Sequence, residues 1–96
     1  MNPFESRARA AKAAKLIAAI DGVLPHIYAR TPEMALRAVE GMGEVGWASA
    51  ANVAGVKLPS LETREVVLDC FRRRVRASVD TQIAQSIAAS LRASVG

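Results

Sequence analysis

Three carboxylates at helical spacing, Glu62, Glu65 and Asp69, form the first group in this chain that could carry acid/base or metal chemistry. Residues three and four apart share one face of a helix, and paired carboxylates serve as general acids, general bases or oxygen ligands. Arg72 and Arg73 follow one turn later, and no histidine lies nearby. Ion pairs within the helix, such as Asp69–Arg73, are the preferred interpretation. We expect no metal site and no catalytic carboxylate.

Nucleophilic chemistry would depend on His26 and Cys70, the single histidine and the single cysteine of the chain. A thiol and an imidazole can form a catalytic dyad. Cys70 lies among apolar residues of a predicted helix, and buried cysteines in such places are usually structural. We therefore expect a buried structural cysteine, no catalytic residues, no cofactor and no small-molecule substrate. One cysteine also excludes a disulfide framework.

Gly41, Gly43 and Gly46 spell the pattern GxGxxG, which binds pyrophosphate in dinucleotide-binding folds. That function needs a strand before the glycines and a helix after them. Residues 32–40 have a helical pattern instead, and Glu44 would repel a phosphate. We interpret these glycines as a turn between two helices.

A second motif covers about residues 48–66. A small residue at Ala51, a glycine four positions on at Gly55, and apolar residues at Val56 and Leu61 resemble the core of a helix-turn-helix DNA-binding motif. The resemblance implies that residues 61 onward form a recognition helix, with Lys57 and Thr63 near DNA. The chain departs from the pattern at Arg64, where a further apolar residue is expected.

Basic residues gather in residues 57–76, which hold six of them against three acidic residues, in a chain of net charge +4 and pI near 10.0. The candidates for a basic patch are Arg72, Arg73, Arg76 and Lys57. Such a patch attracts nucleic acid, anionic membranes or acidic proteins. Because Glu62, Glu65 and Asp69 share the face of three of these arginines, we expect nucleic-acid binding to be weak, and a solvated helix face is favoured.

The composition predicts an all-α fold. The chain has 96 residues, of which 51% are hydrophobic and 4% aromatic, and its abundant alanine disfavours strands. We expect one helical domain over residues 1–96, a compact bundle of four to five helices. Start and stop signals predict helices from about 3 to 21, from 32, over 47–54 and over 60–94, the last being the longest. Gly22 and Gly55 are predicted stops, and residues 23–30 a connector.

Apolar residues in the C-terminal region recur every four positions, at Val79, Ile83, Ile87 and Leu91. Steps of four drift by about 40° around a helix of 3.6 residues per turn. Either the helix breaks near residues 78–80, or its last part faces a different partner. This seam can dock on the N-terminal helix or pair with another chain, and the external alternative is favoured. The interface candidates are Ile83, Ile87, Leu91 and Val95.

Two functions follow as expectations. The favoured one is a non-enzymatic helical interaction protein, an adaptor, inhibitor or assembly factor that is oligomeric and acts through helix faces. The alternative is a helix-turn-helix transcriptional regulator. The partner is therefore a protein or a second copy, with nucleic acid less favoured. No run of apolar residues is long enough to span a membrane, a cytoplasmic location is the default, and the alanine and arginine content suggests a bacterial or phage origin.

Overall fold

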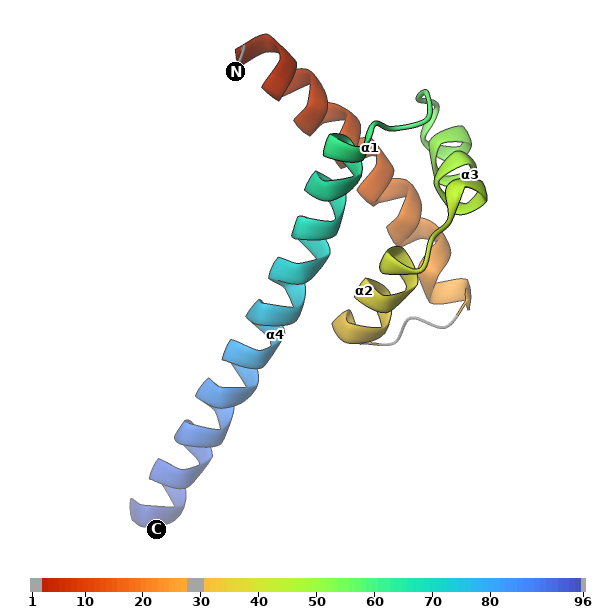
Figure 1. Ribbon diagram of the computed structural model, residues 1–96. Helices are drawn as coiled ribbons and strands as arrows, with labels where there is room; N and C mark the ends of the chain where they lie inside the picture. The colour runs from red at the N-terminus through yellow and green to blue at the C-terminus, as the bar shows by residue number, and fades with distance from the viewer. Residues whose placement is uncertain (1–2, 28–30, 96) are drawn as a thin grey trace.

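The computed structural model describes residues 3–27 and 31–95, and the side chains of His26, Ile27 and Val95 lie outside what it describes. Four helices follow one another: α1 (Pro3–Ile27), α2 (Pro32–Glu40), α3 (Glu44–Ala54) and α4 (Leu61–Val95) (Figure 1). No strand occurs in residues 3–27 or 31–95. The predicted all-α bundle, with its longest helix at the C-terminus, is confirmed.

Helix α1 is longer than the sequence pattern indicates. It runs through Gly22 and ends at Ile27, with Pro25 in its last turn. The prediction that Gly22 stops the helix is therefore wrong, and residues 23–27 of the predicted connector over 23–30 belong to α1. Residues 28–30 lie outside the described residues. Leu24 lies one turn beyond Ile20 and packs against the core, and this burial outweighs the cost of about 1 kcal/mol for a glycine inside a helix.

The ends of α2 and α3 follow local chemistry. Thr31 caps α2, because its hydroxyl accepts a hydrogen bond of 3.2 Å from the backbone N–H of Met34. Gly41 ends α2, and Gly43 precedes α3, so these two glycines form a turn between helices as predicted, whereas Gly46 lies in the first turn of α3. Gly55 ends α3 in the left-handed conformation, with φ of 70°. Thr31 and Gly55 were predicted correctly, although α3 begins three residues before the predicted start.

Helix α4 is continuous over 35 residues. The Ser60 hydroxyl accepts a hydrogen bond of 3.3 Å from the backbone N–H of Thr63 and lies 3.0 Å from its hydroxyl, as expected of a cap. The helix passes through residues 78–80 without a break, so that alternative is wrong. At about 1.5 Å per residue, α4 accounts for most of the longest dimension of the molecule, 57 Å.

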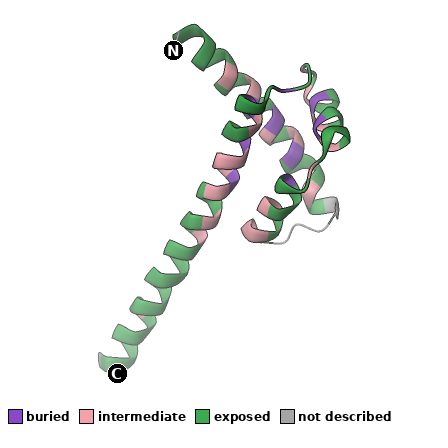
Figure 2. Ribbon diagram, in the orientation of Figure 1, coloured by how far each residue is buried: buried purple, intermediate pink, exposed green. Residues whose placement is uncertain are grey.

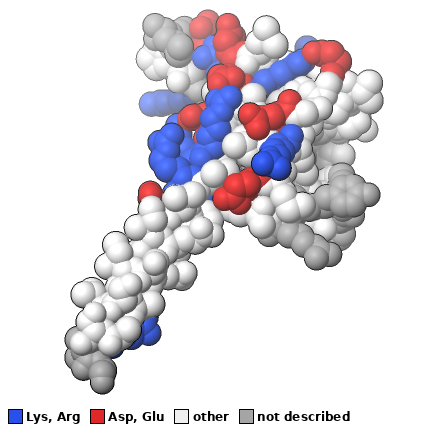
Figure 3. Space-filling view, turned by 60° about the horizontal axis from the view of Figure 1, so that its bottom comes forward, with Lys and Arg blue, Asp and Glu red and all other residues white. Residues whose placement is uncertain are grey.

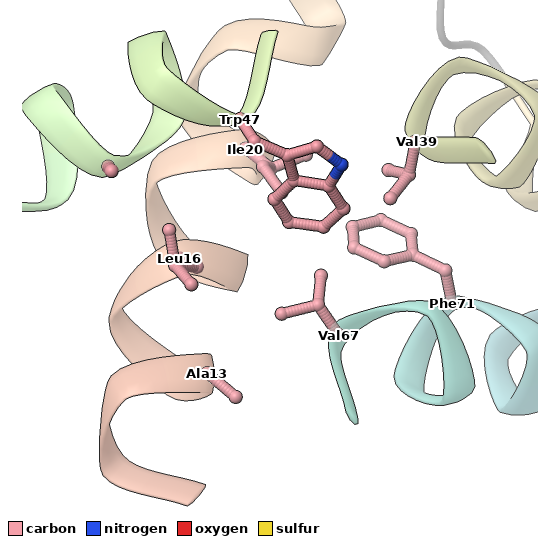
Figure 4. Close-up of a cluster of buried hydrophobic side chains, with 8 residues drawn as sticks. Ala13, Leu16, Ile20, Val39, Trp47, Val67 and Phe71 are labelled. Atoms are coloured by element: carbon pink, nitrogen blue, oxygen red, sulfur yellow. The ribbon is translucent and has the colours of Figure 1, made fainter. Parts of the chain in front are cut away.

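The core lies where the first half of α4 crosses α1 and α2, with α3 packed on α1 (Figure 1). Figure 4 shows the Phe71 ring among Val39, Trp47 and Val67. Phe71 and Val67 have no exposed surface. The buried hydrophobic residues are Ala13, Leu16, Ile20, Val39, Trp47, Ala51, Val67 and Phe71.

We predict opposite effects of alanine at two glycines. Gly55→Ala should destabilise the protein by about 1 kcal/mol, because a Cβ disfavours the left-handed conformation. Gly22→Ala should stabilise it by about 0.5–1 kcal/mol, since Gly22 lies inside α1 with no atom within 4 Å of an added Cβ. Urea unfolding measures both free energies. Loss of stability in Gly22→Ala would mean that α1 stops at Gly22 after all.

Candidate functional site

Helix α4 has a docked half and a projecting half. Thr63, Val67 and Phe71 are buried in the docked half, and no described residue of α4 after Phe71 is buried (Figure 2). We call residues 79–95 the arm. The arm extends away from the bundle (Figure 1), and it raises the radius of gyration to 17.1 Å, against roughly 12–13 Å for a compact domain of this length.

A continuous row of residues explains this change in burial. From Thr63, every fourth residue to Phe71 faces the core, and the row continues through Val75 into the arm. Each step of four turns the row by about 40°. Ile87 therefore points about 200° away from the direction of Val67, on the side of the helix opposite the bundle.

The arm's part of this row, which we call the apolar row, is Val79, Ile83, Ile87 and Leu91. The exposed fractions of these four side chains rise along the helix, from 42% to 53%, 56% and 62%. The predicted interface residues Ile83, Ile87 and Leu91 thus lie in one row that faces solvent, not on the N-terminal helix. The side chain of Val95, the fourth candidate, lies outside the described residues.

The arm carries few charges. Asp80 and Arg92 are its charged residues, and the others are Ala, Ser, Thr, Gln, Val95 and the apolar row. In the face shown in Figure 3, charged side chains gather on the bundle and the arm is mostly uncharged. The hydroxyls of Thr81 and Ser94 donate to carbonyls of their own helix, 2.9 and 3.0 Å away. Most of the arm's polar surface is therefore neutral.

Two of the four candidates for a basic patch are held in ion pairs. Arg72 pairs with Glu65, and Arg73 with Asp69. The hydrogen bond to Glu65 raises the pKa of Arg72 further above its ordinary value. The other two candidates, Arg76 and Lys57, are exposed. Lys57 precedes α4, whereas Arg76 lies about 22 Å along it from Leu61, so the structure does not gather the four candidates into one surface.

The three carboxylates that could have held a metal, Glu62, Glu65 and Asp69, also take part in ion pairs. Glu65 and Asp69 pair with Arg72 and Arg73, as described above. The carboxylate of Glu62 lies 3.7 Å from the guanidinium of Arg9 of α1. The Asp69–Arg73 pair is the one that the sequence predicts. Among the described residues, no three His, Cys, Asp or Glu side chains form a group that could hold a metal ion.

Cys70 is half-buried, more open than the buried cysteine that the sequence predicts. It lies one turn before Arg74, which forms two hydrogen bonds to Asp21 of α1 at 2.7 and 2.9 Å. The bond to Asp21 raises the pKa of Arg74, and Cys70 adds to this effect. The imidazole of His26 lies outside the described residues, so a dyad with Cys70 stays untested.

Arg64 is a structural residue that the sequence analysis missed. Its guanidinium donates to both carboxylate oxygens of Glu44, at 2.6 and 3.0 Å, and to the carbonyl of Pro59 at 3.1 Å. It also lies 5.6 Å from the centroid of the Trp47 ring. The hydrogen bond to Arg64 lowers the pKa of Glu44. The residue that interrupts the helix-turn-helix pattern thus joins α4 to the start of α3.

An apolar groove of about 370 Å³ lies between α1, α2 and α3. Its lining includes Val23 and Leu24 of α1, Met42 between α2 and α3, and Ala50 and Val53 of α3. Sequence spacing gives no signal for it, because the lining comes from separate helices whose packing brings them together.

Comparison with known proteins gives no relative: no family model, no curated protein and no solved structure matches the chain. None of the described helices is long and apolar enough to cross a membrane.

We predict that acid weakens the attachment of α3 to α4 through Glu44. Because Arg64 lowers the pKa of Glu44, the stabilisation that the Glu44–Arg64 pair gives the folded protein is complete above the ordinary glutamate pKa of about 4.3. This stabilisation disappears as the pH falls through the lower pKa that Glu44 has in the folded protein. The melting temperature of Glu44→Gln should therefore fall less between pH 6 and pH 3 than that of the wild type.

The matched control is a double-mutant cycle. In an Arg64→Met background, Glu44→Gln should leave the pH dependence unchanged, because the pair is already absent. An equal effect of Glu44→Gln in both backgrounds would show that Arg64 is not the cause.

Proposed function

We propose that this chain is a non-enzymatic helical interaction protein that associates with a protein partner through its arm and forms oligomers. The observation that carries the proposal is the apolar row, whose four side chains are 42–62% exposed along one line of the arm. Monomeric soluble proteins seldom expose aligned apolar residues without a binding role. The row faces away from the bundle, which leaves a partner helix free to approach it.

The energetics of the arm support association. Full burial of one Val, Leu or Ile side chain contributes about 1.5–3 kcal/mol. These four side chains are already about half covered by their own helix, so a partner would gain roughly 3–6 kcal/mol from covering the rest. This is a substantial driving force beside a total folding stability of about 5–15 kcal/mol.

The ion pairs elsewhere are consistent with a role without catalysis. Glu62, Glu65 and Asp69 each face an arginine, which is the usual arrangement of structural carboxylates on helix surfaces. The charged side chains and the apolar row are separated along α4. Most charged side chains lie on the docked half, and the apolar row lies on the arm. An adaptor, inhibitor or assembly factor fits this separation, because its bundle fixes the orientation of an exposed binding helix.

We predict that the double variant Ile87→Ser/Leu91→Ser lowers the oligomeric mass, because it removes the two most exposed members of the row. Analytical ultracentrifugation measures the mass, and circular dichroism checks the fold. Gln85→Ser/Ala89→Ser is the matched control, since both residues lie on the opposite side of the arm, and it should keep the wild-type mass. An unchanged mass in the first variant, with helicity kept, would refute association through the row.

A helix-turn-helix regulator is the second candidate, and two observations favour it. Ala51 is buried, and Gly55 has the left-handed conformation that ends the first helix of such motifs. Other features do not fit: Leu61 is 77% exposed, and Glu62 and Glu65 stand at the start of the helix that would meet DNA phosphates.

We predict weak binding to DNA, because Arg72 and Arg73 are held by carboxylates of their own helix. Fluorescence anisotropy in near-physiological salt should give a Kd of roughly 1–100 µM with no sequence preference, as is typical of non-specific binding. Lys57→Ala/Arg76→Ala should weaken it more than Arg72→Ala/Arg73→Ala. Sub-micromolar, sequence-selective binding that depends on Arg72 and Arg73 would make the DNA-binding function the better proposal.

A further inference from the structure

The apolar groove between α1, α2 and α3 is a feature of the bundle that the proposed function does not use. We infer that this groove binds one small uncharged apolar molecule that carries a single hydroxyl or carbonyl group. The lining of the groove includes no described residue of α4. Binding there is therefore separate from association through the apolar row, and it goes beyond the proposed function.

Small residues on three helices leave the groove open. Ala19 of α1, Ala38 of α2 and Ala50 of α3 line it with side chains of one methyl group each. Gly46 lines it as well, and a Cβ added there would lie 3.2 Å from the Cβ of Met42. The groove thus results from side chains that are too small to fill the space between the three helices.

The lining sets the chemistry of the ligand. No Lys, Arg, Asp or Glu among the described residues lines the groove, and its larger side chains are Ile20, Val23, Leu24, Met42 and Val53. A charged group would lose its hydration there with no opposite charge to replace it. Apolar cavities in proteins take up uncharged molecules instead, and a cavity of about 150 Å³ lined by Leu, Ile and Phe binds benzene.

The volume of the groove sets the size of the ligand. In proportion to the benzene cavity, a volume of about 370 Å³ has room for roughly 15 non-hydrogen atoms. One turn of helix, about 10 Å wide and 5.4 Å long, already occupies roughly 400 Å³. The groove therefore fits a small molecule, whereas a partner helix would remain largely outside it.

One polar side chain gives the ligand its polar group. Ser49 of α3 lines the groove, and its hydroxyl has no hydrogen-bond partner within the described residues. The hydroxyls of Thr81 and Ser94, by contrast, donate to carbonyls of their own helix. Small-molecule sites typically combine an apolar lining with a few polar groups that fix the orientation of the ligand. The Ser49 hydroxyl can donate to or accept from one hydroxyl or carbonyl of the bound molecule.

The test uses 1-decanol as the probe and Trp47 as the reporter, in the full-length chain. Trp47 is the single tryptophan, it follows Gly46, and it shares a buried cluster with Ile20 of the lining (Figure 4). The fluorescence of Trp47 should change to a saturable end point, with a dissociation constant of roughly 10–100 µM for a ligand of this size. Absence of a saturable change up to the solubility of 1-decanol would overturn the inference.

Substitutions in the lining locate the bound molecule. Ala38→Phe fills part of the groove from an exposed position, and it should weaken binding at least tenfold. Ala48→Phe is the matched control, because Ala48 is exposed on α3 and does not line the groove. Ser49→Ala should weaken binding by about 3–10-fold through the loss of one hydrogen bond. Wild-type affinity in both Ala38→Phe and Ser49→Ala, with helicity kept by circular dichroism, would contradict binding in the groove.

The arm provides the last control, because its exposed side chains could also attract 1-decanol. The Ile87→Ser/Leu91→Ser variant should bind the probe with an affinity within about twofold of the wild type. Loss of binding in this variant would place the probe on the arm and overturn the groove as the site. The oligomeric mass of the same variant tests the proposed function separately, so either proposal can fail without the other.

Discussion

The winding of one row on α4, made of every fourth residue from Thr63 to Leu91, determines how this molecule is organised. A spacing of four residues, repeated from Thr63 to Leu91, cannot keep one direction on a helix of 3.6 residues per turn. The row therefore begins in the core, at Val67 and Phe71, and ends on the opposite side of the same helix. One bundle cannot cover both ends of such a row. The exposed arm is a geometric consequence of the spacing, given that the helix stays continuous.

Two arginines fix where the docked half begins and ends. Arg64 joins α4 to Glu44 at the start of α3, and Arg74 joins it to Asp21 of α1. Each also stacks near an aromatic ring of the core: Arg64 near Trp47, and Arg74 at 4.6 Å from the centroid of Phe71. Exposed ion pairs contribute little to stability on their own. Paired with the aromatic contacts, they set the orientation of α4 and hence the direction in which the arm leaves the bundle.

The sequence predicts the features that depend only on neighbouring residues, such as helix caps and helix stops. The caps at Thr31 and Ser60 and the left-handed stop at Gly55 depend on neighbouring residues, and all three are found. Gly22 was misread because a glycine stops a helix only when no burial continues beyond it, and the packing of Leu24 is a tertiary effect. The spacing of the row likewise predicts that Ile83, Ile87 and Leu91 share one exposed row.

Long-range contacts lie beyond such rules. The Asp21–Arg74 pair joins residues 53 apart, and the Arg64–Glu44 pair joins residues 20 apart. Nothing in their local sequence selects these partners, because the crossing of α1, α3 and α4 decides which side chains meet. The groove between α1, α2 and α3 depends on the same packing. Arg64 illustrates the limit best: by pattern it interrupts an apolar face, whereas in the fold it joins two helices.

The arm is held as a helix mainly by its continuity with the docked half. Helix formation is costly to start but adds residues cheaply once begun, so the packed turn around Phe71 serves as the nucleus for the residues that follow. The arm itself has few charge pairs of the kind that stabilise isolated helices. Its exposed apolar side chains do not stabilise the helix while they face water. Its last turns therefore unfold at a low cost in free energy. A partner that covers the row would stabilise the helix and the complex together, which would couple the helicity of the arm to the concentration of that partner.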